Sequence, residues 1–150
     1  MDFWFGTFKS LEGCIICMDS EEIFRLLQEY FSHREDVAIA LLFGSFAKGT
    51  YNEHSDVDIA VAFKNPRSIE DLVLLQVELS KTCHRDVDLI NLSKAEGTIL
   101  HQIMTTGLRI KYEENLYVYY AMKAIYFYED YLPILRDCQK ERIRRFVHGN

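Results

Sequence analysis

Apolar residues along this 150-residue chain alternate between helix-like spacing and short continuous runs. From residue 20 to residue 32 they recur every three or four positions, and Asp19-x-x-Glu22 precedes them as a helix cap. This stretch predicts an amphipathic helix. Val37 to Phe43 follows as seven apolar residues with no polar alternation, which predicts a strand covered on both faces.

A second strand is predicted from Val57 to Phe63. Because side chains of a strand alternate, four residues share one face: Asp56, Asp58, Ala60 and Ala62. The larger side chains take the other face, where we expect a helix layer. This pattern places two carboxylates side by side at the start of the strand.

The rest of the chain predicts three more helical regions and two more strands. A helix capped by Ser68-x-x-Asp71 leads to a strand over residues 86–92, and a helix over 94–106 ends at Gly107. Residues 108–112 alternate as an edge strand does. A long helical region starts near Asn115, and we expect Pro133 to break it into two helices that meet near residues 130–133.

These elements predict an α/β (α+β) fold, with a small mixed sheet, helices packed on one face and a C-terminal helical extension. The length favours one domain over residues 1–150, with residues 1–18 as a loosely attached N-terminal extension and residues 114–150 as the C-terminal helices.

Composition narrows the function classes. The net charge of −6 argues against a broad nucleic-acid surface, so we expect no direct nucleic-acid binding. No apolar run approaches the ~20 residues of a membrane span. The first 18 residues carry Glu12 and no basic segment, which does not fit a signal peptide. The four cysteines form no complete zinc pattern, and reduced thiols indicate a cytoplasmic protein.

Candidate chemistry gathers in the run Gly44-Ser45-Phe46-Ala47-Lys48-Gly49, which follows the first strand. Gly44 lets backbone N–H groups approach a ligand, Ser45 adds a hydroxyl donor, and Lys48 can neutralise a phosphate. Gly49 completes the spacing of a Walker A loop, but Thr50 stands where that motif needs lysine, so we reject that interpretation. The run predicts a nucleotide-binding turn.

The second half of the site is a set of aspartates. On a strand rising ~3.3 Å per residue, Asp56 and Asp58 are spaced to share Mg²⁺ or to bracket two such ions. A third carboxylate comes from the strand that begins near residue 86, and its alternation alone does not separate Asp86 from Asp88.

Gly44-Ser45, ten further residues, and then Asp56-x-Asp58 resemble the signature of the minimal nucleotidyltransferases, within the superfamily related to DNA polymerase β. The resemblance covers about residues 20–113, with Lys48 in place of a common arginine and Ile59 in place of a common leucine. It implies that Gly44 and Ser45 hold the phosphates of ATP. It further implies that Asp56 and Asp58 bind two Mg²⁺ and that Asp88, favoured over Asp86 by the family's Val-Asp-Leu register, binds one and activates the acceptor.

Short members of this family are similar to the antitoxins of HEPN/MNT toxin–antitoxin modules. The resemblance implies transfer of AMP from ATP to a tyrosine of a cognate HEPN ribonuclease toxin, in a hetero-oligomer with that toxin. Two alternatives stay open: nucleotidyl transfer to an aminoglycoside-like small molecule, and a non-catalytic antitoxin that acts by binding alone. The many tyrosines after residue 111 favour a protein partner, since tyrosine is enriched at interfaces.

Overall fold

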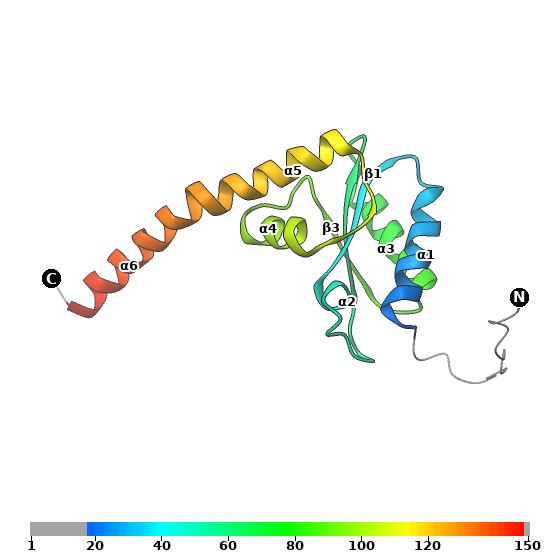
Figure 1. Cartoon of the computed structure of the whole chain (residues 1–150), viewed down its shortest axis with the longest axis horizontal. Coiled ribbons are helices and arrows are strands. Elements are labelled where there is room, and N and C mark those ends of the chain that lie inside the picture. Colours follow the sequence, from blue (N-terminus) through cyan, green and yellow to red (C-terminus); the bar gives the residue numbers. More distant parts are fainter. Residues whose placement is uncertain (1–17, 149–150) are drawn as a thin grey trace, which may run out of the picture.

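A computed structural model describes residues 18–148 as a four-stranded sheet between two layers of helices, followed by a long C-terminal helix (Figure 1). The N-terminal extension predicted for residues 1–18 lies almost wholly outside the described residues. In chain order the elements are α1 (Ser20–Ser32), β1 (Val37–Phe43), α2 (Gly44–Lys48), β2 (Val57–Phe63), α3 (Ile69–Cys83), β3 (Val87–Asn91), α4 (Gly97–Thr106), β4 (Leu108–Lys111), α5 (Glu114–Tyr126), the π-helical turn η1 (Phe127–Tyr131) and α6 (Leu132–His148).

The strand order in the sheet is β3-β2-β1-β4. β1 is antiparallel to both of its neighbours, whereas β2 and β3 are parallel. The parallel pair is joined through helix α3, as a parallel connection requires. Because β2 and β3 run in the same direction, their N-terminal ends lie at the same edge of the sheet, and both carry aspartates there.

Two apolar clusters hold the helices to the sheet. Helices α1 and α3 pack on one face, against alternate residues of β1 and β2 such as Leu42 and Ile59. Helices α4 and α5 pack on the other face, against Leu41 and Ala60. The mixed α/β fold is confirmed, but helices cover both faces of the sheet and not one as the pattern predicted. The small residues of β2 leave space that α4 and α5 fill.

Local sequence explains the element boundaries. The Asp19 carboxylate accepts a hydrogen bond from the Glu22 N–H at 2.8 Å and caps α1. Ser68 and Asp71 form a reciprocal capping box at the start of α3. The predicted boundaries of α1, β1 and β2 are confirmed, and β3 and α4 are slightly shorter than predicted.

The C-terminal region differs from its prediction. α5, η1 and α6 form one nearly continuous helical path that extends away from the sheet (Figure 1). Pro133 is the second residue of α6, directly after the π-helical turn, in which the Leu132 N–H bonds the Phe127 carbonyl. An irregularity therefore occurs near the predicted place, but the chain does not turn there. The π-helical turn takes up the proline, because it already departs from the regular α-helical bonding that proline would interrupt.

Most of this C-terminal helical path is exposed. Tyr120 and Ala124 pack into the α4–α5 cluster, whereas every described side chain from residue 133 to residue 147 is exposed. Phe146 keeps 90% of its surface accessible. No helix among residues 18–148 is long and apolar enough to cross a bilayer.

Candidate active site

Gly44 begins the site at the end of β1, where the chain turns into the short helix α2. Its φ angle is +69°, in the left-handed region that side chains with a Cβ rarely adopt. A Cβ built on Gly44 would lie 2.0 Å from Oδ2 of Asp58, far inside contact distance. Both observations require glycine at this position, and together they bring the backbone of the turn against the Asp58 carboxylate.

The sheet register brings two aspartates together beside this turn. Asp58 of β2 pairs with Asp88 of β3 in the parallel register, so their side chains leave the same face of neighbouring strands. Asp56 precedes Asp58 by two residues and shares its parity. Asp86 lies just before β3, where its carbonyl oxygen accepts a hydrogen bond from the Val57 N–H at 2.9 Å.

These acids repel one another. The pKa of Asp58 is raised above its ordinary value, first because the half-buried carboxyl loses solvent and then because Asp88 and Asp56 lie close to it. Among residues 18–148, no ion pair links any of the three acids to a cation. The site therefore concentrates negative charge without compensating it, as a cation site does before its ion binds.

The chemistry of this set fits a hard divalent cation. No three His, Cys, Asp or Glu side chains in the described part of the chain form a ready metal-binding group. Mg²⁺ does not require one, because it commonly keeps several waters and takes one or two carboxylates together with the phosphates of a substrate. The set fits a metal ion that arrives with a nucleotide.

The other residues of the nucleotide-binding prediction are spread along α2. Ser45 follows Gly44 and is half-buried, whereas Lys48 is the last residue of α2 and its side chain is exposed. Gly49 caps the helix with a φ of +69°, and a Cβ built there would meet nothing within 4 Å. The structure therefore places Ser45 at the start of α2, next to Gly44, and Lys48 and Gly49 at the far end of this helix.

The sequence assigned no role to Arg85, which the structure places against the loop that leads to Asp56. Its guanidinium donates hydrogen bonds to main-chain carbonyls of the loop that leads to Asp56. The same group lies over the ring of Phe46 in α2. The only sequence signal for Arg85 was its place directly before the acid-bearing strand, and that signal says nothing of a contact with a loop some 30 residues away.

An open hollow of about 890 Å³ lies next to the acids, between the loop before β2 and the C-terminal half of α3. Asp56 and Asp86 line it, together with the basic residues Lys81 and Arg85. Asp58 and Asp88 are not among its lining residues. The hollow gives a large ligand access to one side of the acid set from solvent.

Known proteins resemble this chain over most of its length. The protein adenylyltransferase MntA of Shewanella oneidensis is 27% identical over 112 residues, which cover 75% of this chain and 78% of that protein. A crystal structure of a toxin–antitoxin complex with AMP-PNP contains a chain similar to this one, with a TM-score of 0.63, 24% identity, and coverage of 88% of this chain and all of that chain. A structure of tri-AMPylated Shewanella oneidensis HEPN toxin in complex with MNT antitoxin gives a TM-score of 0.57 at 22% identity, with coverage of 87% and 96%.

The solved structures establish the fold, and the family is established by sequence. The model of the family described as "Polymerase beta, Nucleotidyltransferase" matches residues 26–115, which span the Gly44 turn and the four aspartates Asp56, Asp58, Asp86 and Asp88. By its sequence, its fold and the convergence of turn and acids, the chain belongs to the polymerase β nucleotidyltransferase family.

Proposed function

We propose that this protein transfers AMP from Mg·ATP to a tyrosine hydroxyl of a HEPN-type toxin and thereby inactivates the toxin. The observation that carries the proposal is the contact between Gly44 and Asp58, beside Asp88 in the neighbouring strand. A phosphate-binding turn and a set of carboxylates without compensating charge meet at one point, as nucleotidyl transfer needs. The similarity to a protein adenylyltransferase supports a protein as the acceptor.

Each residue of the site has a part in this proposal. The N–H groups after Gly44 and the Ser45 hydroxyl bind the β- and γ-phosphates. Lys48 and Gly49, at the end of α2, complete the nucleotide-binding segment. Asp56, Asp58 and Asp88 would hold two Mg²⁺, which would neutralise charge on the phosphates. Asp58 is close to both of the other acids, so its carboxylate would contribute to holding the ions.

The acceptor hydroxyl attacks the α-phosphorus of ATP. A bond forms between the tyrosine oxygen and this phosphorus, the bond from the phosphorus to the bridging oxygen breaks, and pyrophosphate leaves with its electron pair. Asp88 accepts the hydroxyl proton, because it is the member of the set on the strand farthest from the Gly44 turn. Orientation of the two reactants contributes much of the rate enhancement.

A surface for a protein partner is available on the C-terminal helices. Tyr126 of α5 is 59% exposed, and exposed apolar side chains continue along α6. α6 also carries five basic and two acidic residues, although the whole chain has a net charge of −6. Tyr119, Tyr128 and Tyr131 are exposed as well. Such aromatic surface suits a stable hetero-oligomer with the toxin. We expect the reaction to take place in the cytoplasm, because that compartment supplies ATP.

The proposal is tested by incubating the purified chain with Mg·ATP and the protein encoded by the adjacent reading frame, followed by intact-mass measurement of both chains. We expect the partner to gain one or more AMP groups and its ribonuclease activity to fall. A double variant, Asp56→Asn with Asp58→Asn, should form the same complex without adding mass. Asp36→Asn is the matched control, because Asp36 lies at the opposite end of the sheet, and it should transfer AMP as the unmodified chain does.

Two outcomes would contradict the proposal. Neutralisation of the partner with no added mass, unchanged in the double variant, would assign inhibition to binding alone. Transfer of AMP to an aminoglycoside in the same assay, with none to the protein, would assign a small-molecule acceptor.

A further inference from the structure

Arg85 connects three segments that the nucleotidyl-transfer site depends on. It lies between the end of α3 and the start of β3, two residues before the strand that carries Asp88. The residue before it, His84, adopts a left-handed conformation with a φ of 50°, and so turns the chain sharply out of α3. This turn directs the half-buried Arg85 side chain toward the loop before β2.

The first connection is to the loop over residues 52–55. Nη1 of Arg85 donates toward the carbonyl oxygens of Asn52 at 3.3 Å, Glu53 at 3.0 Å and Ser55 at 3.3 Å. The loop is also closed on itself, because the Asn52 N–H bonds the Ser55 hydroxyl at 2.8 Å. Three carbonyls that converge on one cation fix the course of the chain immediately before Asp56.

The second connection is to α2. The guanidinium carbon of Arg85 lies 5.4 Å from the centre of the Phe46 ring, within the range of a cation–π contact. Phe46 is 2% exposed and stacks on Tyr51 with ring centres 4.4 Å apart. Since Phe46 follows Gly44 and Ser45 directly, Arg85 ties the phosphate-binding turn to the same loop.

Arg85 makes these contacts with carbonyls and a ring and not with an acid. No ion pair joins Arg85 to a carboxylate within residues 18–148. Arg85 therefore does not neutralise Asp56 or Asp86, although both line the same hollow. An arginine that served only to neutralise this edge of the molecule would pair with one of them.

We propose that Arg85 is a positioning residue that sets the distance between the Gly44–Ser45 turn and Asp56, and so determines how tightly the site binds a divalent cation with a nucleotide. Lysine would keep the charge but not the planar group that lies on Phe46 while its N–H groups reach the loop. The inference rests on the proposed function, since it concerns the same site.

The test compares Arg85→Met and Arg85→Lys with Arg67→Met. Arg67 is the matched control. Its guanidinium also lies over a phenylalanine, Phe63, at 5.8 Å, and it donates a hydrogen bond to Asp36, but these contacts lie at the other end of β2. Binding of Mn²⁺ is measured from the loss of the free-ion paramagnetic resonance signal, with α,β-methylene-ATP present. Amide hydrogen exchange of residues 52–57 and the melting temperature are measured on the same samples.

We expect Arg85→Met to weaken Mn²⁺ binding about 10- to 100-fold, as loss of groups that orient metal ligands does, and to speed exchange in the loop. Arg85→Lys should fall between Arg85→Met and the unmodified chain. Arg67→Met should lower the melting temperature and leave Mn²⁺ affinity unchanged, which separates positioning from general stability.

Unchanged Mn²⁺ affinity in Arg85→Met would overturn the inference, as would equal losses of affinity in Arg85→Met and Arg67→Met. If Arg85→Met does not fold, Arg85→Lys decides alone, and affinity and loop exchange equal to those of the unmodified chain would again overturn it. Failure of the unmodified chain to bind Mn²⁺ with the analogue would instead contradict the proposed function.

Discussion

The aspartates at the two ends of strand β2 lie in opposite charge environments. At its N-terminal end, Asp58 faces Asp56 and Asp88, and the pKa of Asp58 is raised. At its C-terminal end, Asp36 accepts hydrogen bonds from Arg34 at 2.9 and 3.0 Å and from Arg67 at 3.1 Å. The Arg34 guanidinium holds the pKa of the Asp36 carboxyl below its usual range.

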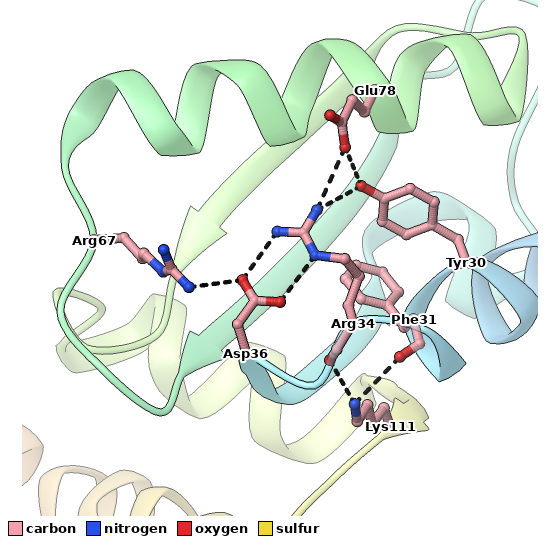
Figure 2. A network of polar contacts seen from close by, with 7 residues as sticks. All are labelled: Tyr30, Phe31, Arg34, Asp36, Arg67, Glu78 and Lys111. Carbon is pink, nitrogen blue, oxygen red and sulfur yellow. Dashed lines mark hydrogen bonds and ion pairs between the residues drawn. The ribbon is translucent and has the colours of Figure 1, made fainter.

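At the C-terminal end of β2, Asp36 belongs to a polar network that joins three elements, as Figure 2 shows. Arg34 reaches from the end of α1 to Asp36, to the Tyr30 hydroxyl and to Glu78 of α3. Tyr30 in turn donates to Glu78, and burial together with this bond raises the pKa of Tyr30 to about 12. Lys111 of β4 closes the network by donating to the Arg34 carbonyl at 2.6 Å. Both carboxylates of this network, Asp36 and Glu78, form ion pairs with arginine, so their charge is compensated within the chain.

The difference between the ends indicates which acids serve function. Asp36 and Asp58 are both half-buried aspartates beside the same strand, so residue type and exposure do not distinguish them. They differ in that one is compensated within the chain and the other is repelled by its neighbours. A folded protein keeps such repulsion where an external cation relieves it, at a cost in stability of the free protein.

The largest expected effect comes from removing the charge of Asp58. We expect Asp58→Asn to lower AMP transfer on the order of 10³-fold, because a metal-bound phosphate loses several kcal/mol of charge stabilisation and each 1.36 kcal/mol is a factor of ten. Rates are measured at saturating Mg·ATP with the partner protein. Asp36→Asn serves as control, and equal losses in both variants would remove the distinction between the two ends.

Gly44 tests whether the turn must touch Asp58. Gly44→Ala places a methyl group where the Asp58 carboxylate lies, and we expect a loss of transfer of about 100-fold, as small misplacements of reacting groups cause. Gly49→Ala is the comparison variant: Gly49 lies at the far end of the same nucleotide-binding segment and has the same φ of +69°, but open space surrounds its Cβ position, so we expect a smaller loss of transfer. Both variants should lose about 1–2 kcal/mol of stability from the left-handed backbone. Equal transfer rates in the two variants would show that the contact with Asp58 is irrelevant.

The contrast between the ends marks the limit of what the sequence could predict. Strand alternation predicted Asp56 and Asp58 on one face, because a period of two follows from backbone geometry alone, and Asp56 lies close enough to Asp58 to raise its pKa. The pairing of Asp58 with Asp88 needed the register of β2 against β3, which no local pattern contains. The contact of Gly44 with Asp58 likewise depends on how β1 delivers its turn to the next strand.

The structure also differs from the sequence-based expectations elsewhere. Helices cover both faces of the sheet because α4 and α5 fill the space above Ala60 and Ala62, and the sequence shows only that these residues are small. Pro133 predicted a break between helices, but a π-helical turn before it absorbs the lost hydrogen bond. Arg85 is separated by about 30 residues from the carbonyls it binds. Contacts between distant segments decided the helix layers and the role of Arg85, whereas the π-helical turn is a local change of hydrogen bonding that residue spacing does not reveal.

Ligand binding should stabilise the folded protein, and this stabilisation should depend on Asp58 and not on Asp36. Addition of Mg²⁺ with α,β-methylene-ATP at about 100 times the dissociation constant should raise the free energy of unfolding by about 2.7 kcal/mol. Asp36→Asn should gain as much as the unmodified chain, whereas Asp58→Asn should gain little, and EDTA should abolish the gain. The measurement is thermal unfolding with and without ligand. A full gain in Asp58→Asn would place the metal elsewhere.

The smallest effect is the most direct test of the two charge environments, and it has opposite signs at the two ends. Asp36 has a lowered pKa, so its stabilisation is present above the ordinary carboxyl range and is lost as the pH falls. Asp36→Asn should therefore cost about 0.5–1 kcal/mol at neutral pH, the scale of partly exposed ion pairs, and nothing in acid.

Asp58 has a raised pKa, so its contribution is most favourable in acid and is lost as the pH rises. Without divalent cations, Asp58→Asn should be more stable than the unmodified chain at neutral pH, and this gain should vanish in acid. Urea unfolding between pH 3 and pH 8 measures both differences, and the same sign for the two variants at neutral pH would mean that the Asp58 end is already compensated without an external cation.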